Sequence, residues 1–376
     1  MKNMLFISIN DHVPWGGSEV LWSETAKALH EKVQVSVLVK KWQKEAEGIA
    51  KIKSLGISLY YKHTQNKPSF KSRVLKKVMK KDFEKNHCLE QEGLSKPDLV
   101  IISLGNHLDR QLFYYTNFLI KNKIPYVLVF QLVSDLKLVQ DDVIEQFRAS
   151  YLHAEKLYFL SEDNFDKVEM QLSIVFKNRD FVNNPFNYIQ NYTELKPADT
   201  YNIACVGALV TFHKGQELLL KVLAKQKWKG RNLKLNLYGE GINQQQIQRL
   251  INLYDLQDKI NLKGYLSDKN KIWKENVACI MPSRMEGQSL AMLEAMAHGR
   301  MVISTKVGDA ERLVVPGETG FLIDAPTVAL IDKTLEEAWQ QRDKWISMGK
   351  QSRRHLYKII EKDPVIDFSE KLGALL

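Results

Sequence analysis

The sequence predicts an α/β protein with two domains, each built on a parallel sheet that helices cover on both faces. Short β-rich segments alternate with helical segments along the chain, a pattern typical of parallel sheets made of βαβ units. The chain has 376 residues, a length that suits two domains better than one. A polar stretch with little periodicity, residues 186–200, separates two such patterns. We therefore expect two Rossmann-like domains joined by a linker.

The N-terminal domain is expected over residues 1–185. Helices are predicted at 19–29 and 139–153, between β-rich segments. Ligands in open α/β sheets bind at the carboxyl ends of the strands, so the loops that follow the strands are the places to look for chemistry. The predicted strands are 4–9, 33–39, 99–104, 126–130 and 157–160.

The alternating pattern restarts in the C-terminal domain, which is expected over residues 201–361. A final helix within 362–376 can pack back on the N-terminal domain. With two such domains, the natural binding site is the cleft between them. The predicted strands are 201–206, 233–238, 260–263, 277–281 and 301–304, and the predicted helices are 216–227, 244–253, 290–298 and 328–348.

Composition excludes several classes of protein. Hydrophobic residues make up 44% and charged residues 26% of the chain, which excludes wholesale disorder. No apolar run is long enough for a transmembrane helix, and the start of the chain is typical of a strand rather than a signal peptide. The three cysteines are widely spaced and form no CxxC motif, so we expect a reduced, cytoplasmic protein.

The formal net charge of +10 favours anionic partners without choosing among them. Residues 67–85 carry eight Lys or Arg, with apolar residues at three- and four-residue steps, which predicts a basic amphipathic helix. This helix could contact the anionic inner face of a membrane peripherally, at about 1 kcal/mol for each basic residue near the surface. The alternative is a domain helix whose apolar residues pack on the sheet and whose basic face is solvated. No aromatic platform accompanies the charges, so nucleic acid is not expected.

The first candidate loop, residues 10–19, follows the first predicted strand. Its adjacent glycines Gly16 and Gly17 would let the backbone approach a ligand, and the helix start offers N–H groups to an anion. The spacing is not GxGxxG, so the dinucleotide fingerprint is absent. A plain glycine turn with Ser18 as helix cap is the alternative. His12 and His107 lie near predicted loops and could contact an acceptor, but no metal-ligand spacing links them.

The second candidate is Lys214, at the start of a helix after the first strand of the C-terminal domain. A cation at a helix N-terminus opposes the helix dipole, so it lowers stability unless an anion accompanies it. A lysine together with helix N–H groups suits a diphosphate. The alternative is a lysine that is simply exposed to solvent.

The third and strongest candidate is the segment 284–299, a loop that leads into a helix. Glu286 lies just before the helix and Glu294 about five residues into it, so their separation is that of two parts of a nucleotide and not of an acid/base dyad. Each carboxylate can accept hydrogen bonds from hydroxyl groups. The N–H groups of Gln288, Ser289 and Leu290 can hold phosphates between them. The alternative is a helix with one solvated and one internally paired glutamate.

These residues give a resemblance to a known family. Segment 286–294 resembles the E-x7-E signature of retaining glycosyltransferases of family 4, which have the GT-B fold. The matching segments also include the Gly-Gly-Ser-Glu loop, 206–215, 238–241, 261–265 and 307–322. The resemblance implies two domains that face each other across a cleft. It also implies retaining transfer of a hexosyl-type sugar from a UDP- or GDP-linked donor to a glycan or lipid-linked acceptor, as in surface polysaccharide or glycoconjugate synthesis. No metal and no cofactor are expected, and the chain contains no DxD triplet.

The resemblance also implies roles for individual residues. Glu294 corresponds to the carboxylate that holds the ribose hydroxyls, and Glu286 to the catalytic one that contacts the donor sugar. Lys214 corresponds to the lysine that binds the diphosphate. Gly17 falls in the loop that approaches the donor phosphates. The further donor-side residues are Tyr265 and Leu266, which frame the base, and Gly287, Gln288, Ser289 and Leu290; the acceptor-side residues are His12, Gly16 and His107.

The chain departs from the family pattern at two positions. Ala208 stands where an arginine is frequent, so one cation for the leaving diphosphate is missing. Gln131, after the strand 126–130, stands where a histidine is frequent; it can bind a sugar hydroxyl but cannot transfer a proton. Two hypotheses follow: an active transferase, in which Gln131 takes part, or a degenerate protein that binds a sugar nucleotide or glycan without transfer. A nicotinamide oxidoreductase rests on fold analogy alone.

Overall fold

The computed structural model describes residues 1–62, 89, 94, 96–136, 138–187, 189, 192, 194–196 and 199–376, and the expected basic helix at 67–85 lies outside them. The chain forms two compact units. Unit 1 comprises Met1–Phe159, Phe165–Val182 and Pro364–Leu376, and unit 2 comprises Leu160–Asn164 and Asn183–Asp363. Unit 2 therefore includes the stretch 186–200 that was expected to be a linker.

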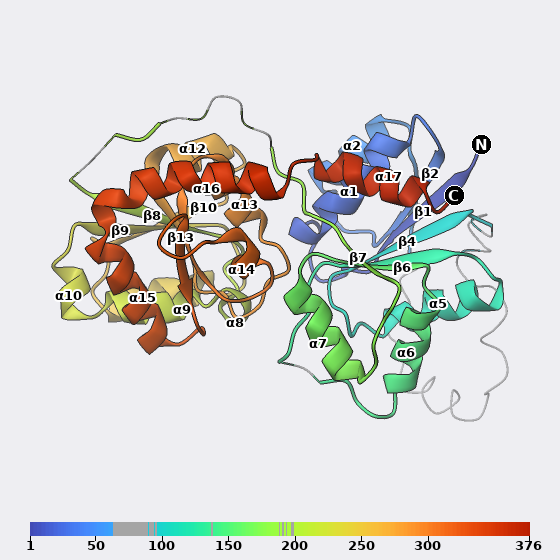
Figure 1. The fold of residues 1–376 in the computed structure, drawn as a ribbon, viewed down its shortest axis with the longest axis horizontal. Helices are drawn as coiled ribbons and strands as arrows, with labels where there is room; N and C mark the ends of the chain where they lie inside the picture. The colour runs from blue at the N-terminus through green and yellow to red at the C-terminus, as the bar shows by residue number, and fades with distance from the viewer. Residues whose placement is uncertain are drawn as a thin grey trace. The chain divides into compact units, whose positions relative to one another are not determined.

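Unit 1 is built on a seven-stranded parallel sheet of order β3-β2-β1-β4-β5-β6-β7 (Figure 1). In the centre of the sheet, Leu5 is in register with Ser36 on one side and with Val100 on the other. The order reverses between β1 and β4, so the connections from these two strands leave in opposite directions. The strands are β1 (Asn3–Ser8), β2 (Gln34–Val39), β3 (Ser58–Tyr61), β4 (Leu99–Leu104), β5 (Tyr126–Phe130), β6 (Lys156–Phe159) and β7 (Arg179–Phe181).

The C-terminal helix α17 (Pro364–Gly373) packs against α1 in unit 1 (Figure 1). Phe368 meets the ring of Tyr158 edge-on, with 5.1 Å between centroids, and Lys371 Nζ lies 3.2 Å from Asp180 Oδ1. The last helix thus covers the sheet of unit 1 although it follows unit 2 in the sequence. The other helices of this part of the chain are α1 (Val20–Leu29), α2 (Glu47–Ser54), α5 (Gln111–Lys121), α6 (Ile144–Leu152) and α7 (Glu162–Leu172), with a 3-10 turn, η1, at Gly17–Glu19.

Unit 2 is built on a six-stranded parallel sheet of order β10-β9-β8-β11-β12-β13, which reverses between β8 and β11. The strands are β8 (Tyr201–Val206), β9 (Leu233–Tyr238), β10 (Ile260–Gly264), β11 (Ala278–Met281), β12 (Met301–Thr305) and β13 (Gly320–Ile323). The helices are α8 (Thr211–Lys214), α9 (Gln216–Leu223), α10 (Gln226–Lys229), α11 (Gln244–Leu253), α12 (Lys269–Glu275), α13 (Leu290–Ala297), α14 (Ala310–Leu313), α15 (Val328–Gln340) and α16 (Trp345–Ile359), with a 3-10 turn, η2, at Arg342–Lys344.

Both faces of this sheet are buried, which explains the continuous apolar runs of its strands. In β8, Ile203 and Cys205 belong to one core cluster and Ala204 to the cluster on the opposite face. In β11, Ile280 and Cys279 divide in the same way. Successive side chains in a strand point to opposite faces, so a strand covered on both sides must be apolar at every position.

The structure differs from the predicted elements mainly at the edges and at breaks in helices. Three strands were not predicted: β3 and β7, which are edge strands of unit 1, and β13, an edge strand of unit 2. The helix predicted at 328–348 is two helices, α15 and α16, separated by the η2 turn. Among the described residues, no helix combines the length and apolar character that a membrane span requires.

Candidate active site in unit 2

The candidate site lies where the order of the second sheet reverses. The chain leaves β8 toward β9 on one side and leaves β11 toward β12 on the other. Loops that diverge from adjacent parallel strands open a crevice at their carboxyl ends, which is where open α/β sheets bind ligands. The loop after β8 leads to α8, and the loop after β11 carries Glu286. Lys214 is the last residue of α8, two positions before α9 begins, and not at the start of a helix as the sequence predicted.

Lys214 and Glu286 form an ion pair in this crevice. Lys214 Nζ lies 2.6 Å from Glu286 Oε1, and Ser283 Oγ donates to the same carboxylate oxygen at 2.7 Å. The two charged side chains are 24% and 10% exposed, so the pair is shielded but reachable from solvent. The structure thus brings together the cation and one of the two carboxylates that the sequence singled out, 72 residues apart in the chain.

Two features fix the loops on which this ion pair depends. Gly215, between α8 and α9, has φ +64°, and a Cβ there would lie 2.1 Å from the carbonyl oxygen of Pro282. Arg284 donates to the Thr211 carbonyl at 2.8 Å and to Glu217 Oε1 at 2.5 Å. Arg284 therefore joins the loop after β11 to α8 and α9. Because it is engaged there, it does not supply the cation that is missing at position 208.

The N-terminus of α13 faces the same loop. Ser289 is the N-cap residue but makes no side-chain capping hydrogen bond, because its hydroxyl instead contacts Met281 Sδ at 3.5 Å. The first N–H groups of a helix have no partner within the helix, so this end of α13 can bind an anion. Ser289 follows Glu286 by three residues, so Glu286 and the start of α13 belong to one loop, which Lys214 meets from the end of α8.

The side chain of Gln288 has a structural role within unit 2. Its Oε1 accepts from the Asn184 N–H at 2.5 Å, and its Nε2 donates to Asn183 Oδ1 at 2.8 Å and to Asp309 Oδ2 at 2.7 Å. Gly287 also accepts a hydrogen bond from the Asp309 N–H, at 2.9 Å. These contacts shape the loop, so a phosphate here would meet backbone N–H groups rather than the Gln288 amide.

Glu294, the fifth residue of α13, has a carboxylate without a hydrogen-bond partner among the described residues. It is half-buried, and no other described residue gives its side chain a hydrogen bond. Burial raises the pKa of this carboxyl, and the nearby charge of Lys269 only partly opposes that shift. Burying a charged group without a partner is costly, so the geometry suits a ligand whose hydroxyl groups donate to Glu294.

Lys269 is a residue that the sequence analysis missed. Its ammonium lies 5.5 Å from the ring centroid of Tyr265, donates to the Leu266 carbonyl at 3.5 Å and influences Glu294 electrostatically. It thereby connects the two expected base-framing residues with the expected ribose ligand. Tyr265 itself is 67% exposed. No sequence motif includes Lys269. Its proximity to Tyr265 and Glu294 becomes visible only in the folded chain, where it begins α12.

The remaining predicted residues lie in unit 1. His12 is exposed in the loop after β1, Gly16 has extended backbone, and Gly17 is exposed at the start of η1. Gln131 follows β5 and is buried, with its Nε2 lacking a hydrogen-bond partner. A buried donor without an acceptor is unfavourable, so the Gln131 side-chain amide can donate to a ligand.

His107 does not fit its predicted role as an acceptor contact. It is 1% exposed, its Nε2 lies 2.8 Å from Gln171 Oε1, and burial lowers its pKa to about 4. It is therefore an interior, neutral histidine. The sequence placed it near a loop, but could not show that its side chain is buried.

Glu19, which closes the Gly-Gly-Ser-Glu loop, also proves to be buried. Its carboxylate accepts from Trp22 Nε1 at 2.7 Å and from Ser8 Oγ and Asn10 Nδ2 at 3.1 Å each. These bonds hold the start of α1 against the end of β1. Ser18 is not the helix cap, because Glu19 occupies the N-cap position of α1.

Comparison with solved structures defines the class of fold. The crystal structure of HepE from Anabaena in complex with UDP matches with a TM-score of 0.74 at 15% identity, covering 100% of this chain and 99% of that one. The lipopolysaccharide outer core galactosyltransferase WaaB matches with a TM-score of 0.72 at 16% identity, covering 100% of both chains. The protein therefore has the two Rossmann-like α/β units of the GT-B fold, as the sequence predicted.

Comparison of sequences shows similarity to glycosyltransferases over part of the chain. Residues 200–339, most of unit 2, match the family described as "Glycosyl transferases group 1". A 181-residue segment is 25% identical to an uncharacterized glycosyltransferase of Haemophilus influenzae, covering 47% of this chain and 51% of that protein. A 123-residue segment is 29% identical to the poly(ribitol-phosphate) alpha-N-acetylglucosaminyltransferase of Staphylococcus aureus, covering 32% and 25%. The chain thus matches about half or less of the length of these relatives.

Proposed function

We propose that the protein is a retaining glycosyltransferase that moves a hexosyl-type sugar from a nucleotide-diphosphate donor to a glycan or lipid-linked acceptor. One observation carries the proposal: a lysine and a glutamate, 2.6 Å apart at the reversal point of the second sheet, lie in the loops beside the uncapped end of α13. This arrangement offers a cation and unpaired N–H groups to a diphosphate, and carboxylates to the hydroxyl groups on either side of it.

In this proposal each residue has one task when the donor binds. The diphosphate takes over the Lys214 ammonium and the N–H groups at the start of α13. Glu286 is released toward the sugar, and Glu294 accepts from the ribose hydroxyls. Lys214 then stabilises the charge that develops on the leaving diphosphate, a preorganised effect that is usually a large part of catalysis. A displacement on one face of the sugar needs no protein base, so Gln131 serves as a hydrogen-bond donor.

The donor is proposed to be a UDP- or GDP-sugar, and the reaction is proposed to need no metal and no cofactor. HepE was crystallised with UDP and with UDP-glucose, which supports the first choice. A role in surface polysaccharide or glycoconjugate synthesis would suit a cytoplasmic protein that contacts the inner face of the membrane peripherally through residues 67–85.

The test is calorimetry of the full chain with UDP, GDP and UDP-glucose, together with thermal unfolding. A ligand that binds only the native state raises the melting temperature. Lys214→Gln should weaken nucleotide binding about tenfold or more, the value of hydrogen bonds to a charged group. Lys271→Gln, an exposed lysine of the same unit, is the matched control. Equal nucleotide affinity in both variants would overturn the assigned role of Lys214.

A second candidate is a protein that binds a sugar nucleotide or a glycan without transfer. Ala208 favours it, because the leaving diphosphate has one cation fewer. Hydrolysis or transfer of a UDP- or GDP-sugar above background, lost in Glu286→Gln, would exclude this candidate. Binding without any turnover across a panel of acceptors would favour it.

A further inference from the structure

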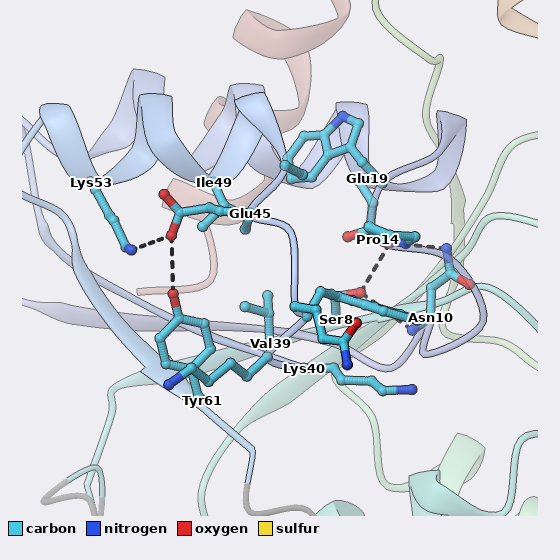
Figure 2. Close-up of a pocket in the computed structure, with 15 residues that line it drawn as sticks. Ser8, Asn10, Pro14, Glu19, Val39, Lys40, Glu45, Ile49, Lys53 and Tyr61 are labelled. Carbon is cyan, nitrogen blue, oxygen red and sulfur yellow. Dashed lines mark hydrogen bonds and ion pairs between the residues drawn. The ribbon is translucent and has the colours of Figure 1, made fainter.

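A cavity of about 300 Å³ lies wholly within unit 1, at the carboxyl ends of β1, β2 and β3 (Figure 2). It is lined by the loop after β1, the segment that follows β2, helix α2 and the end of β3. This volume is at the lower end of the range for small-molecule sites. The roles proposed for unit 2 leave this cavity unassigned.

Three lysines line the cavity, and two of them have no carboxylate partner. Lys53 forms an ion pair with Glu45, whose carboxylate also accepts from the Tyr61 hydroxyl at 3.4 Å, as Figure 2 shows. Lys40 and Lys41 make no ion pair with any described residue, and Lys40 Nζ donates only to the backbone carbonyl of Asp11, at 2.8 Å. The cavity therefore holds an excess of positive charge.

The second carboxylate in the wall, that of Glu19, does not neutralise this excess. It is 5% exposed and already accepts four hydrogen bonds from its own neighbours. Burial raises the pKa of Glu19, although these bonds oppose the shift. The ammonium groups of Lys40 and Lys41 would repel an incoming cation. The same two groups would attract an incoming anion.

Aromatic side chains form much of the remaining wall. Lys40 Nζ lies 4.2 Å from the ring centroid of Trp42, and Lys41 Nζ lies 5.6 Å from that of Tyr61. Trp15 packs on α2 so closely that a Cβ on Gly48 would lie 2.1 Å from its ring. Cations held over aromatic faces are positioned in advance, and flat rings suit the C–H face of a pyranose.

We propose that this cavity binds an anionic group on a saccharide, a phosphate or a carboxylate, with Lys40 and Lys41 supplying the charge and Trp15 and Trp42 contacting the sugar. Both anions share the chemistry that a lysine recognises as a point charge. The proposal rests on the proposed function in one respect: the saccharide is the acceptor of the transfer reaction, which would therefore be an acidic glycan or a sugar phosphate.

The test measures binding of matched neutral and anionic saccharides to the full chain by calorimetry in low salt. Hyaluronan tetrasaccharide is compared with chitotetraose for the carboxylate, and glucose 6-phosphate with glucose for the phosphate. At least one anionic probe should bind about tenfold more tightly than its neutral counterpart, and the Lys40→Gln/Lys41→Gln double variant should lose about that factor. Lys32→Gln, an exposed lysine of unit 1 outside the cavity, is the matched control.

Glu45→Gln gives a result that misfolding cannot imitate. Removing this carboxylate frees Lys53, so anion affinity should rise about fivefold, the value of one charge interaction at the dielectric constant of water. Equal binding of neutral and anionic probes, or anion affinities that neither the lysine variants nor Glu45→Gln alter, would overturn the proposal. So would competitive displacement of the saccharide by UDP, because the lysines would then serve the donor.

UDP binding, measured in parallel, separates this proposal from the proposed function. If UDP binds and no anionic saccharide does, the cavity proposal alone fails. If an anionic saccharide binds in a lysine-dependent way and no nucleotide binds, the cavity is a saccharide site and the transferase assignment fails.

Discussion

Replacing Glu286 by glutamine should tighten UDP binding while it abolishes sugar transfer. In the ligand-free protein the Glu286 carboxylate holds the Lys214 ammonium at 2.6 Å, so a diphosphate must displace it and then lie beside its charge. Two unit charges about 4 Å apart interact by about 1 kcal/mol at the dielectric constant of water and by about 4 kcal/mol at an effective value near 20. Because both side chains are partly exposed, we use the lower figure, which corresponds to about a fivefold gain in UDP affinity.

Glutamine keeps the size of the side chain and can still accept from Ser283 Oγ, so the loop should keep its shape. The measurements are calorimetry with UDP and release of UDP from a UDP-sugar, with Lys214→Gln as the opposite case. Glu337→Gln, an exposed glutamate in α15, provides the matched control. If Glu286→Gln weakens UDP binding as much as Lys214→Gln does, Glu286 is a direct ligand of the nucleotide and the reasoning is wrong.

Three further predictions concern single residues. Glu294→Ala should weaken nucleotide binding about tenfold. The same substitution should raise the melting temperature of the protein without nucleotide at pH 7, because burial raises the pKa of this carboxyl and its ionised form lowers stability. Gly215→Ala should lower the free energy of unfolding of unit 2 by about 3 kcal/mol in urea, since φ is +64° and a Cβ would strike the Pro282 carbonyl. Gly317→Ala is the control: φ is +78° but nothing lies within 4 Å of a Cβ there, so the free energy of unfolding should fall by only about 1 kcal/mol. The pKa of His107 falls from 6.5 to about 4 in the folded protein, so wild type should lose about 3 kcal/mol of stability between pH 6.5 and pH 4 that His107→Gln does not lose.

Each of these predictions has a result that contradicts it. For Glu294, the sign follows from linkage: a raised folded pKa means that stability increases as the pH falls through it, and a melting temperature that drops in the alanine variant would refute the assignment. For Gly215, equal destabilisation of the two glycine variants would show that the contact with Pro282 yields easily. For His107, parallel pH profiles of wild type and variant would mean that the folded imidazole still takes up a proton.

Local sequence patterns predicted the central strands because those strands are buried on both faces and must be apolar throughout. The same criterion missed β3, an edge strand that is only partly buried. It also missed β13, an edge strand that is mostly buried but has only four residues and begins with Gly320. It also missed β7, whose segment of three residues is too short to show a period. The Glu286–Glu294 spacing could be read directly, because both residues lie on one loop and helix.

The distance between Lys214 and Glu286 was decided by tertiary structure. They come from the segments after β8 and β11, which become neighbours only because the sheet reverses its order there. Tertiary structure also decided that Lys269, in α12, lies near Tyr265 and influences Glu294 electrostatically. It likewise formed the cavity around Lys40, which is enclosed by the ends of three strands. Burial of His107 likewise depends on elements distant in sequence.

The sequence by itself determined the class of fold and the chemical character of the loops, since periodicity, helix starts and residue types are local properties. Only the tertiary structure decided which charges are paired, which are buried without a partner and which face an open cavity. The physical reason is that electrostatic energy depends on distance and solvent exposure, and both are set by strand order and packing rather than by separation along the chain.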